Sequence, residues 1–226
     1  MDSDKMARFV MLAMGANHVL AAFVLGLVLA PTVAAAQPQT CTYADWTWSA
    51  AERRAVDIRE VEKPYAALRD DERDGSTGCS LCREDQVEIV LPGVAPFKVC
   101  KAVAEDVEAA LTRALARGFE IETVTGYRVG RSKGVLDIDG KRTEYSNHSF
   151  GLAIDINAGK NGLYDRCTEF SGKCRLMRGG EWRPDAPGGI APDTPLYEEL
   201  TGMGWQWGGE LPGRQKDFMH FSPSGD

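Results

Sequence analysis

The sequence predicts an α+β fold in which a small antiparallel sheet is flanked by helices and fastened by disulfide bonds. Three observations support this prediction. Several short segments alternate polar and apolar residues as half-buried strands do, one longer segment has the apolar period of a helix, and the 226 residues include six cysteines. No internal repeat and no second domain are evident.

The predicted strands lie at residues 86–91, 119–125 and 152–156, and a closing strand includes residues 219–221. Each of these segments is short, which is typical of a small sheet rather than of a large sandwich or barrel. Residues 129–145 are rich in glycine and charge, and they suit a hairpin or a mobile loop.

The clearest helix is predicted from Val99 to Leu115, where apolar residues recur on one face and charged residues fill the other. Gly118 follows at the position of a C-terminal cap. We expect a shorter helix from Pro195, with Thr194 as its N-cap. One or two short helices are also expected in the charged residues 49–73.

The first 36 residues have the order of a secretory signal, with basic residues, an apolar run at 20–30 and then small residues at 34–36. The apolar run is shorter than the roughly 20 residues that a membrane span needs. We therefore predict cleavage after Ala36, with a retained membrane anchor as the alternative. Asp2 and Asp4 offset the basic charge, which makes Met6 an alternative start. The mature protein would be periplasmic or secreted, with no stable membrane span.

Cleavage would leave about 190 residues, enough for one domain with a core, and would keep the formal net charge at −7. An acidic protein lacks the basic face that phosphate groups require, so we expect no nucleic-acid partner. We expect residues 37–226 to form a single domain that acts as a monomer.

All six cysteines follow the predicted cleavage point, and an even number of cysteines in an exported chain indicates disulfides. Cys167 and Cys174 flank a short loop and are expected to pair. That bond would staple residues 158–193, a long segment without a clear period. Spacing does not assign the other four, which are Cys41, Cys79, Cys82 and Cys100.

Cys79 and Cys82 also have the spacing of a redox pair or of half a zinc knuckle. No second pair of ligands with that spacing exists in the chain, and no thioredoxin-like pattern surrounds them. Disulfide formation is therefore the favoured interpretation.

Three histidines occur in the sequence, and the two that follow the predicted cleavage point lie in two short motifs. His148 belongs to SNHSFGLAIDIN, residues 146–157, and His220 belongs to DFMHF, residues 217–221. Asp155 lies in the first motif and faces away from the large apolar residues of its strand. Two imidazole nitrogens and one carboxylate oxygen can hold a catalytic zinc and leave a fourth position open. The sequence therefore predicts that the sheet carries a zinc site.

Hydrolysis at such a site also needs a base that takes a proton from the attacking water. Asp217, three residues before His220, is the best candidate if a bend separates it from the closing strand. The alternative is an ordinary surface acid.

The two motifs resemble those of the zinc D-alanyl-D-alanine carboxypeptidases. The pattern is Ser-x-His-x-x-Gly-x-Ala-x-Asp from Ser146 to Asp155, followed by Asp-x-x-His-Phe from Asp217 to Phe221. The wider family includes vancomycin-resistance dipeptidases and carboxypeptidases, phage L-alanyl-D-glutamate endopeptidases and, more distantly, the signalling domain of hedgehog proteins. Residues 126–128 and 205–209 also match, so the resemblance covers residues 119–221.

The resemblance implies a role for each residue of the predicted site. His148, Asp155 and His220 would bind zinc. Asp217 would act as general base and then as general acid to the leaving amine. Arg128 would polarise the scissile carbonyl and stabilise the oxyanion, and the alternative for Arg128 is a salt bridge at a strand end.

Substrate contacts are implied for three further residues, Ser146, Tyr127 and Trp207. Ser146 would help to orient the substrate, Tyr127 would donate a hydrogen bond and Trp207 would wall the cleft. An indole at this position is as often part of the core.

The chain departs from the dipeptidases of the family at Asp217, where they have glutamate. Aspartate is the residue that the endopeptidase branch tends to show. The family does not account for the cysteine-containing residues before the predicted helix. We therefore divide the mature chain into an N-terminal extension, residues 37–100, and a catalytic core, residues 101–226.

The leading hypothesis is a zinc peptidase that cleaves a bond involving a D-amino acid in the peptidoglycan stem peptide, as a D-alanyl-D-alanine carboxypeptidase does. Its substrate carries carboxylates, and Arg131, Lys133 and Arg142 offer positive charge near Arg128. The alternatives are an L-alanyl-D-glutamate-type endopeptidase and a non-catalytic, zinc-containing module that binds the cell wall. Asp217 and Arg128 favour a hydrolase. A disulfide-stapled structural protein without metal would leave the positions of the histidines unexplained.

Overall fold

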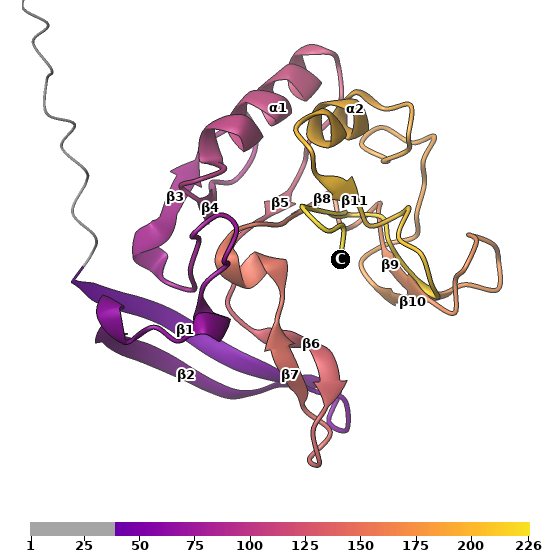
Figure 1. Ribbon diagram of the computed structural model, residues 1–226. Helices are drawn as coiled ribbons and strands as arrows, with labels where there is room; N and C mark the ends of the chain where they lie inside the picture. The colour runs from indigo at the N-terminus through magenta and orange to yellow at the C-terminus, as the bar shows by residue number, and fades with distance from the viewer. Residues whose placement is uncertain (1–38) are drawn as a thin grey trace, which may run out of the picture. The chain divides into compact units, whose positions relative to one another are not determined.

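The structure, a computed structural model, describes residues 39–226, so the predicted signal segment lies outside the described residues. Within that range the strands form four small sheets, and two α-helices accompany them (Figure 1). This architecture confirms the predicted α+β class. Neither helix of the described chain is long and apolar enough to cross a membrane.

The N-terminal strands β1 (Thr40–Ser49) and β2 (Arg54–Pro64) form an antiparallel pair. The prediction of one or two short helices in residues 49–73 holds only for the end of this segment, where two short 3-10 helices follow, because residues 54–64 form β2. β2 lies at the edge of its sheet, where charged side chains remain in solvent. The charges of this segment therefore belong to an edge strand and not to the solvated side of a helix.

The predicted hairpin at residues 129–145 is confirmed as the antiparallel pair β6 (Arg131–Leu136) and β7 (Arg142–Tyr145). Thr47 of β1 pairs with Arg131 of β6 in the parallel sense, so the order of this sheet is β2-β1-β6-β7. The pairing places the residues that precede the first motif against the N-terminal strands.

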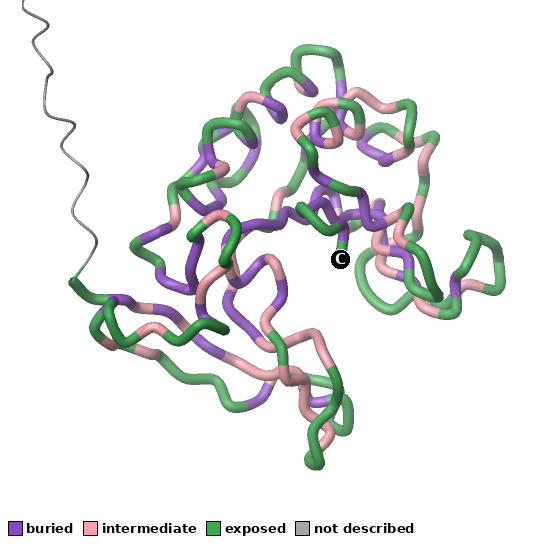
Figure 2. Tube along the Cα trace, in the orientation of Figure 1, coloured by how far each residue is buried: buried purple, intermediate pink, exposed green. Residues whose placement is uncertain are grey.

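A second antiparallel sheet carries two of the predicted zinc ligands. It has the order β11-β13-β8-β5, with bounds β11 (Gln206–Trp207), β13 (His220–Ser222), β8 (Ile154–Ile156) and β5 (Val124–Thr125). Every residue of β8 and β13 is buried (Figure 2). The strand predicted at residues 119–125 is shorter than expected, because Glu122 and Thr123 donate their N–H groups to the side chain of Asn157.

The third sheet contains a hairpin that the sequence did not reveal. β9 (Leu163–Asp165) pairs with β10 (Arg175–Arg178) on one side and with β12 (Gln215–Asp217) on the other, all antiparallel. The disulfide between Cys167 and Cys174 closes the connection between β9 and β10, and this pairing was predicted. A covalent bond thus constrains a segment that lacks a periodic pattern.

Helix α1 (Ala104–Ala116) covers the main core with the apolar face that was predicted. It begins later than expected, because Val99 belongs to β4 (Phe97–Cys100), which pairs with β3 (Gln86–Ile89). Gly118 has a φ of 88° just after the helix, as a C-terminal cap requires.

Helix α2 (Pro195–Gly202) lies beside α1 (Figure 1). The predicted N-cap is confirmed, since the Thr194 side chain accepts a hydrogen bond from the N–H of Tyr197. Glu199 of α2 pairs with Arg113 and Arg117 of α1. The two helices therefore close the core from one side and leave the sheet of β8 and β13 to carry the site.

Two further disulfides join Cys41 to Cys82 and Cys79 to Cys100. They resolve the pairing that spacing left open, and they exclude a redox or zinc role for the Cys79 and Cys82 pair. Three disulfides fit a protein of an oxidising compartment, such as the periplasm or the extracellular space.

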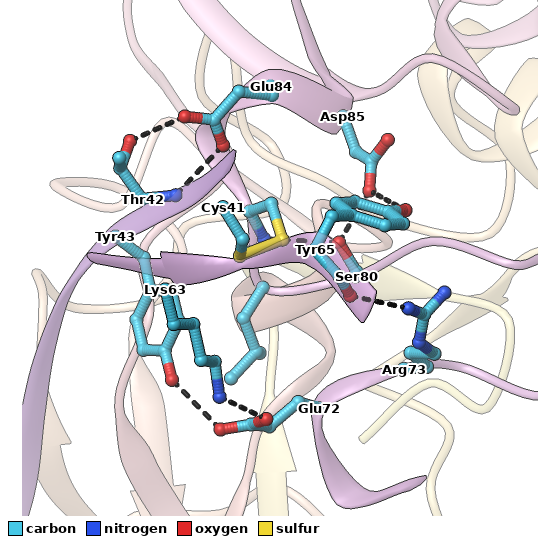
Figure 3. The surroundings of a disulfide bond; sticks show 12 residues. Cys41, Thr42, Tyr43, Lys63, Tyr65, Glu72, Arg73, Ser80, Glu84 and Asp85 are labelled. Carbon is cyan, nitrogen blue, oxygen red and sulfur yellow. Dashed lines mark hydrogen bonds and ion pairs between the residues drawn. A yellow bond between two sulfur atoms is a disulfide. The ribbon is translucent and has the colours of Figure 1, made fainter. Parts of the chain in front are cut away.

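Two buried acids hold the N-terminal extension together around the first of these disulfides (Figure 3). Glu72 accepts hydrogen bonds from Tyr43 and Lys63, and Asp85 accepts one from Tyr65. Burial disfavours the ionised form of both acids, but their hydrogen bonds and lysine partners lower the pKa of each carboxyl below its ordinary value. Both acids are therefore ionised and structural.

Candidate active site

Three predicted ligands come together from two strands and a turn. His220 of β13 pairs directly with Asp155 of β8, so their side chains share one face of the sheet. His148 comes from a 3-10 turn, Asn147–Phe150, that precedes β8. Gly151 ends this turn with a φ of 68°, and a Cβ there would collide with the backbone nitrogen of Cys100. Only glycine can therefore reverse the chain between the first two ligands.

The ligand atoms converge on one carboxylate oxygen. Oδ1 of Asp155 lies 3.0 Å from Nε2 of His148 and 2.9 Å from Nδ1 of His220. All three atoms lie within 4.8 Å of one another, and the three residues are 2–5% exposed. This is the spacing that a single divalent ion requires of its ligands.

Backbone carbonyls set the tautomers of both histidines. Nδ1 of His148 lies 2.8 Å from the carbonyl oxygen of Gly126, and Nε2 of His220 lies 3.2 Å from that of Asp226. A carbonyl oxygen can only accept, so these nitrogens carry the protons. The other two nitrogens, which face Asp155, are then free to act as ligands.

Charge completes the fit to zinc. Burial lowers the pKa of His148 below its ordinary value, although the neighbouring Asp155 opposes this shift. Burial opposes ionisation of Asp155, yet the nearby His148 and His220 hold its pKa well below the usual range. A neutral imidazole and an ionised carboxylate are the forms that bind a metal ion. The donor set therefore fits a zinc site with three protein ligands and an open fourth position.

Asp217 lies at the end of β12, and a two-residue bend separates it from β13, as the sequence analysis required. The residue is partly buried, and its buried Oδ1 atom has no hydrogen-bond partner. Burial and the negative charge of Asp155 raise the pKa of Asp217 to about 6. Asp217 is therefore a partly buried acid near Asp155 rather than a fully exposed surface residue.

Arg128 follows β5 and donates from Nη2 to Oδ2 of Asp155 at 3.1 Å. The salt bridge that we considered as an alternative role is thus present, and it places the guanidinium beside the ligands. Nε of Arg128 and Oγ of Ser146 are buried without partners, as is Oδ1 of Asp217. These are three of the five such side-chain atoms in residues 39–226. Buried polar atoms are costly when unpaired, so these three atoms are available to bind water or substrate.

The polar groups of Tyr127 and Trp207 form hydrogen bonds within the protein. The hydroxyl of Tyr127 donates to the carbonyl oxygen of Leu81 in the N-terminal extension. The indole of Trp207 is 3% exposed, and its Nε1 donates to the carbonyl oxygen of Phe218. Both side chains have structural partners, and these contacts do not support the predicted roles in substrate binding.

The basic residues near Arg128 are also engaged within the protein. Arg131 stacks 4.0 Å from the ring of Tyr145. Lys133 pairs with Asp226 at 3.1 Å, and Arg142 donates to the carbonyl oxygen of Gly134. These side chains therefore stabilise the hairpin and its surroundings before any substrate binds.

Arg178 is a residue of the site that the sequence analysis missed. In the sheet β10-β9-β12 it pairs with Leu163, which pairs in turn with Asp217, so the three residues form one row across the sheet. Arg178 is exposed, has no ion pair to another described residue, and is close enough to lower the pKa of Asp217. Periodicity could not identify it, because its strand lies in the segment that the disulfide constrains.

Comparison with known proteins gives one family match, which covers part of the chain. Residues 139–223 match the family model described as D-alanyl-D-alanine carboxypeptidase. The match includes the three ligands and Asp217, and it begins after Arg128 and after the N-terminal extension. No curated protein and no solved structure gives a significant match. The predicted resemblance to this family is therefore confirmed.

Proposed function

Because residues 139–223 match the D-alanyl-D-alanine carboxypeptidase family, we propose that the protein is a zinc-dependent peptidase of the peptidoglycan stem peptide. It would hydrolyse a bond that involves a D-amino acid. The observation that carries the proposal is the convergence of His148, Asp155 and His220 beside Asp217, a partly buried carboxylate with a buried, unpartnered oxygen. A structural module would not need such an acid.

The chain supplies three ligands for the ion. His148 would bind through Nε2, Asp155 through Oδ1 and His220 through Nδ1, the atoms that face one another. When bound, zinc supplies Lewis acidity, which polarises a carbonyl and makes water easier to deprotonate. Arg128 holds the second oxygen of Asp155, which leaves the first oxygen directed at the two imidazoles.

Asp217 would carry the proton through the reaction. With a pKa of about 6, its carboxylate is ionised at neutral pH and remains a stronger base than an ordinary aspartate. It would take a proton from the attacking water at Oδ1, the unpartnered oxygen, and then deliver that proton to the nitrogen of the leaving amine. A pKa near the working pH suits both steps.

Arg128 would stabilise the negative charge that develops on the scissile carbonyl oxygen. Its Nε is buried and has no partner within the described chain, so this N–H group is available to an oxyanion. A preorganised donor of this kind typically contributes about 3 kcal/mol to the transition state. The buried hydroxyl of Ser146 would help to orient the substrate backbone.

Arg178 would bind the free carboxylate at the end of the substrate. Two strand spacings, about 10 Å, separate its backbone from that of Asp217. Residues directly opposite one another share a face of the sheet, so the Arg178 charge would lie on the same side as Asp217, close enough to lower the pKa of that acid. This placement favours carboxypeptidase action. Aspartate rather than glutamate at position 217 is the feature that favours the endopeptidase alternative.

The experiment is a digestion of purified muropeptides by the zinc-loaded protein, with products identified by mass spectrometry. We expect loss of one terminal D-alanine, and no product from Asp217→Asn. Asp193→Asn is the matched control, because Asp193 is exposed and its side chain makes no hydrogen bond among the described residues. A cut between L-alanine and D-glutamate would establish the endopeptidase alternative. Muropeptides that stay intact with the zinc-loaded wild type would contradict the proposal.

A further inference from the structure

The side-chain amide of Asn147 joins the two segments that carry the histidine ligands. Its Nδ2 lies 3.0 Å from Oγ of Ser222, 2.8 Å from Oγ of Ser224 and 2.7 Å from the carbonyl oxygen of Asp226. Asn147 directly precedes His148, and the three acceptors follow His220. One amide group therefore ties the turn of the first histidine to the chain that follows the second.

The Asp226 carbonyl that Asn147 holds is also the partner of a ligand. It lies 3.2 Å from Nε2 of His220 and 3.3 Å from Oγ of Ser222. Because this carbonyl can only accept, its position determines that His220 carries its proton on Nε2. The lone pair then lies on Nδ1, which faces Asp155.

The partner of His148 is fixed in a different way. Its Nδ1 bonds to the carbonyl oxygen of Gly126, and Gly126 follows β5 in the buried sheet. Asp226 belongs to no strand, and its residue is exposed. The side chain of Lys133 pairs with the Asp226 carboxylate at 3.1 Å, but this contact leaves the main-chain carbonyl unheld. Asn147 and the Ser222 hydroxyl hold the carbonyl itself, and the Asn147 amide is the nearer donor, at 2.7 Å against 3.3 Å.

We infer that Asn147 is a positioning residue, which fixes the Asp226 carbonyl and through it the tautomer and ring orientation of His220. The inference rests on the proposed metal site and names a residue outside the ligand set. Hydrogen-bond partners of metal-bound histidines typically change metal affinity by roughly 10–100-fold when they are removed. We therefore assign Asn147 an effect of this size on zinc binding.

The test measures zinc affinity of the purified protein by competition with a chromophoric chelator. Asn147→Ala and Asn147→Asp should both weaken zinc binding by roughly 10–100-fold, because neither side chain can donate to the carbonyl. Ser224→Ala is the matched control. It removes one acceptor of the amide and the hydroxyl that donates to the Asp226 carboxylate, and it leaves the bond from the amide to the Asp226 carbonyl. It should change the affinity by less than about threefold.

A second readout separates positioning from general destabilisation. Nitrogen NMR of the histidine side chains in the metal-free protein should show His220 protonated on Nε2 in the wild type and a mixture of tautomers in Asn147→Asp. His148 should keep its tautomer in both proteins. If both Asn147 variants bind zinc as tightly as the wild type, or if His220 keeps its tautomer, the role assigned to Asn147 is refuted and the proposed metal site stands. If the wild type binds no zinc, the proposed metal site fails with it.

Discussion

Neutralising Asp217 should stabilise the metal-free protein, and the gain should grow with pH. Burial, followed by the charge of Asp155, raises the pKa of Asp217 from 3.8 to about 6. The folded protein thus holds this proton more tightly than the unfolded chain does, so stability falls as pH rises from about 4 to above 6. A shift of about 2 pKa units corresponds to a loss of about 3 kcal/mol.

The assay compares urea unfolding of Asp217→Asn and wild type between about pH 4 and about pH 8 with chelator present. Asparagine keeps the shape of the side chain and cannot ionise. The difference in unfolding free energy should increase with pH, in favour of the variant, by up to about 3 kcal/mol. Asp193→Asn is again the control. A difference that stays constant across this range would refute the view that Asp217 is an acid with a raised pKa.

Three other perturbations test the charges and the metal. Arg178→Gln should raise KM for a substrate with a free terminal carboxylate by roughly tenfold and leave kcat nearly unchanged, whereas Arg175→Gln, on the same hairpin but already ion-paired, should not raise KM. Equal KM values for the two variants would show that Arg178 does not bind the substrate. Glu72→Ala should lower the unfolding free energy by about 3 kcal/mol, because Lys63 loses a buried partner, while Glu62→Ala, at an exposed position, should change it by less than about 0.5 kcal/mol. A chelator should lower the Tm, and zinc at about 100 times its Kd should restore about 2.7 kcal/mol of stability. A Tm that changes neither with the chelator nor with zinc would argue against a bound metal.

The ligand set could be predicted because the sequence offers few candidates. His148 and His220 are the histidines that follow the predicted cleavage point, and alternation in one short strand places Asp155 on the opposite face from its apolar neighbours. Their convergence then depends on one register, in which His220 lies directly across from Asp155. The alternation in the sequence and the observed strand pairing therefore agree on where the Asp155 side chain lies.

The remaining parts of the site depend on contacts between distant segments. Tyr127 stands beside Arg128 in the sequence, yet it extends toward Leu81 in the N-terminal extension, which the family resemblance does not cover. Arg178 is placed by pairing across two strands, and Asn147 is placed by the return of the chain to Asp226. Each of these contacts joins segments that are far apart in the sequence, so neither periodicity nor motif spacing predicts it.

The elements that were predicted wrongly also depend on contacts between distant segments. Residues 54–64 carry many charges, and a short helix was predicted in this segment. They instead pair with β1 and form the edge strand of a sheet. Residues 119–123 alternate as a strand does, but the side chain of Asn157 takes two of their N–H groups. In both cases a tertiary partner overrides the local preference.

The central claim is that His148, Asp155 and His220 hold one zinc ion. X-ray absorption spectroscopy of the purified protein, together with its metal content, tests this claim most directly. The account predicts one zinc per chain, with nitrogen and oxygen ligands at about 2.0–2.2 Å. The signal should be lost in His148→Ala. A protein without stoichiometric zinc, or a zinc with sulfur ligands at about 2.3 Å, would contradict the account.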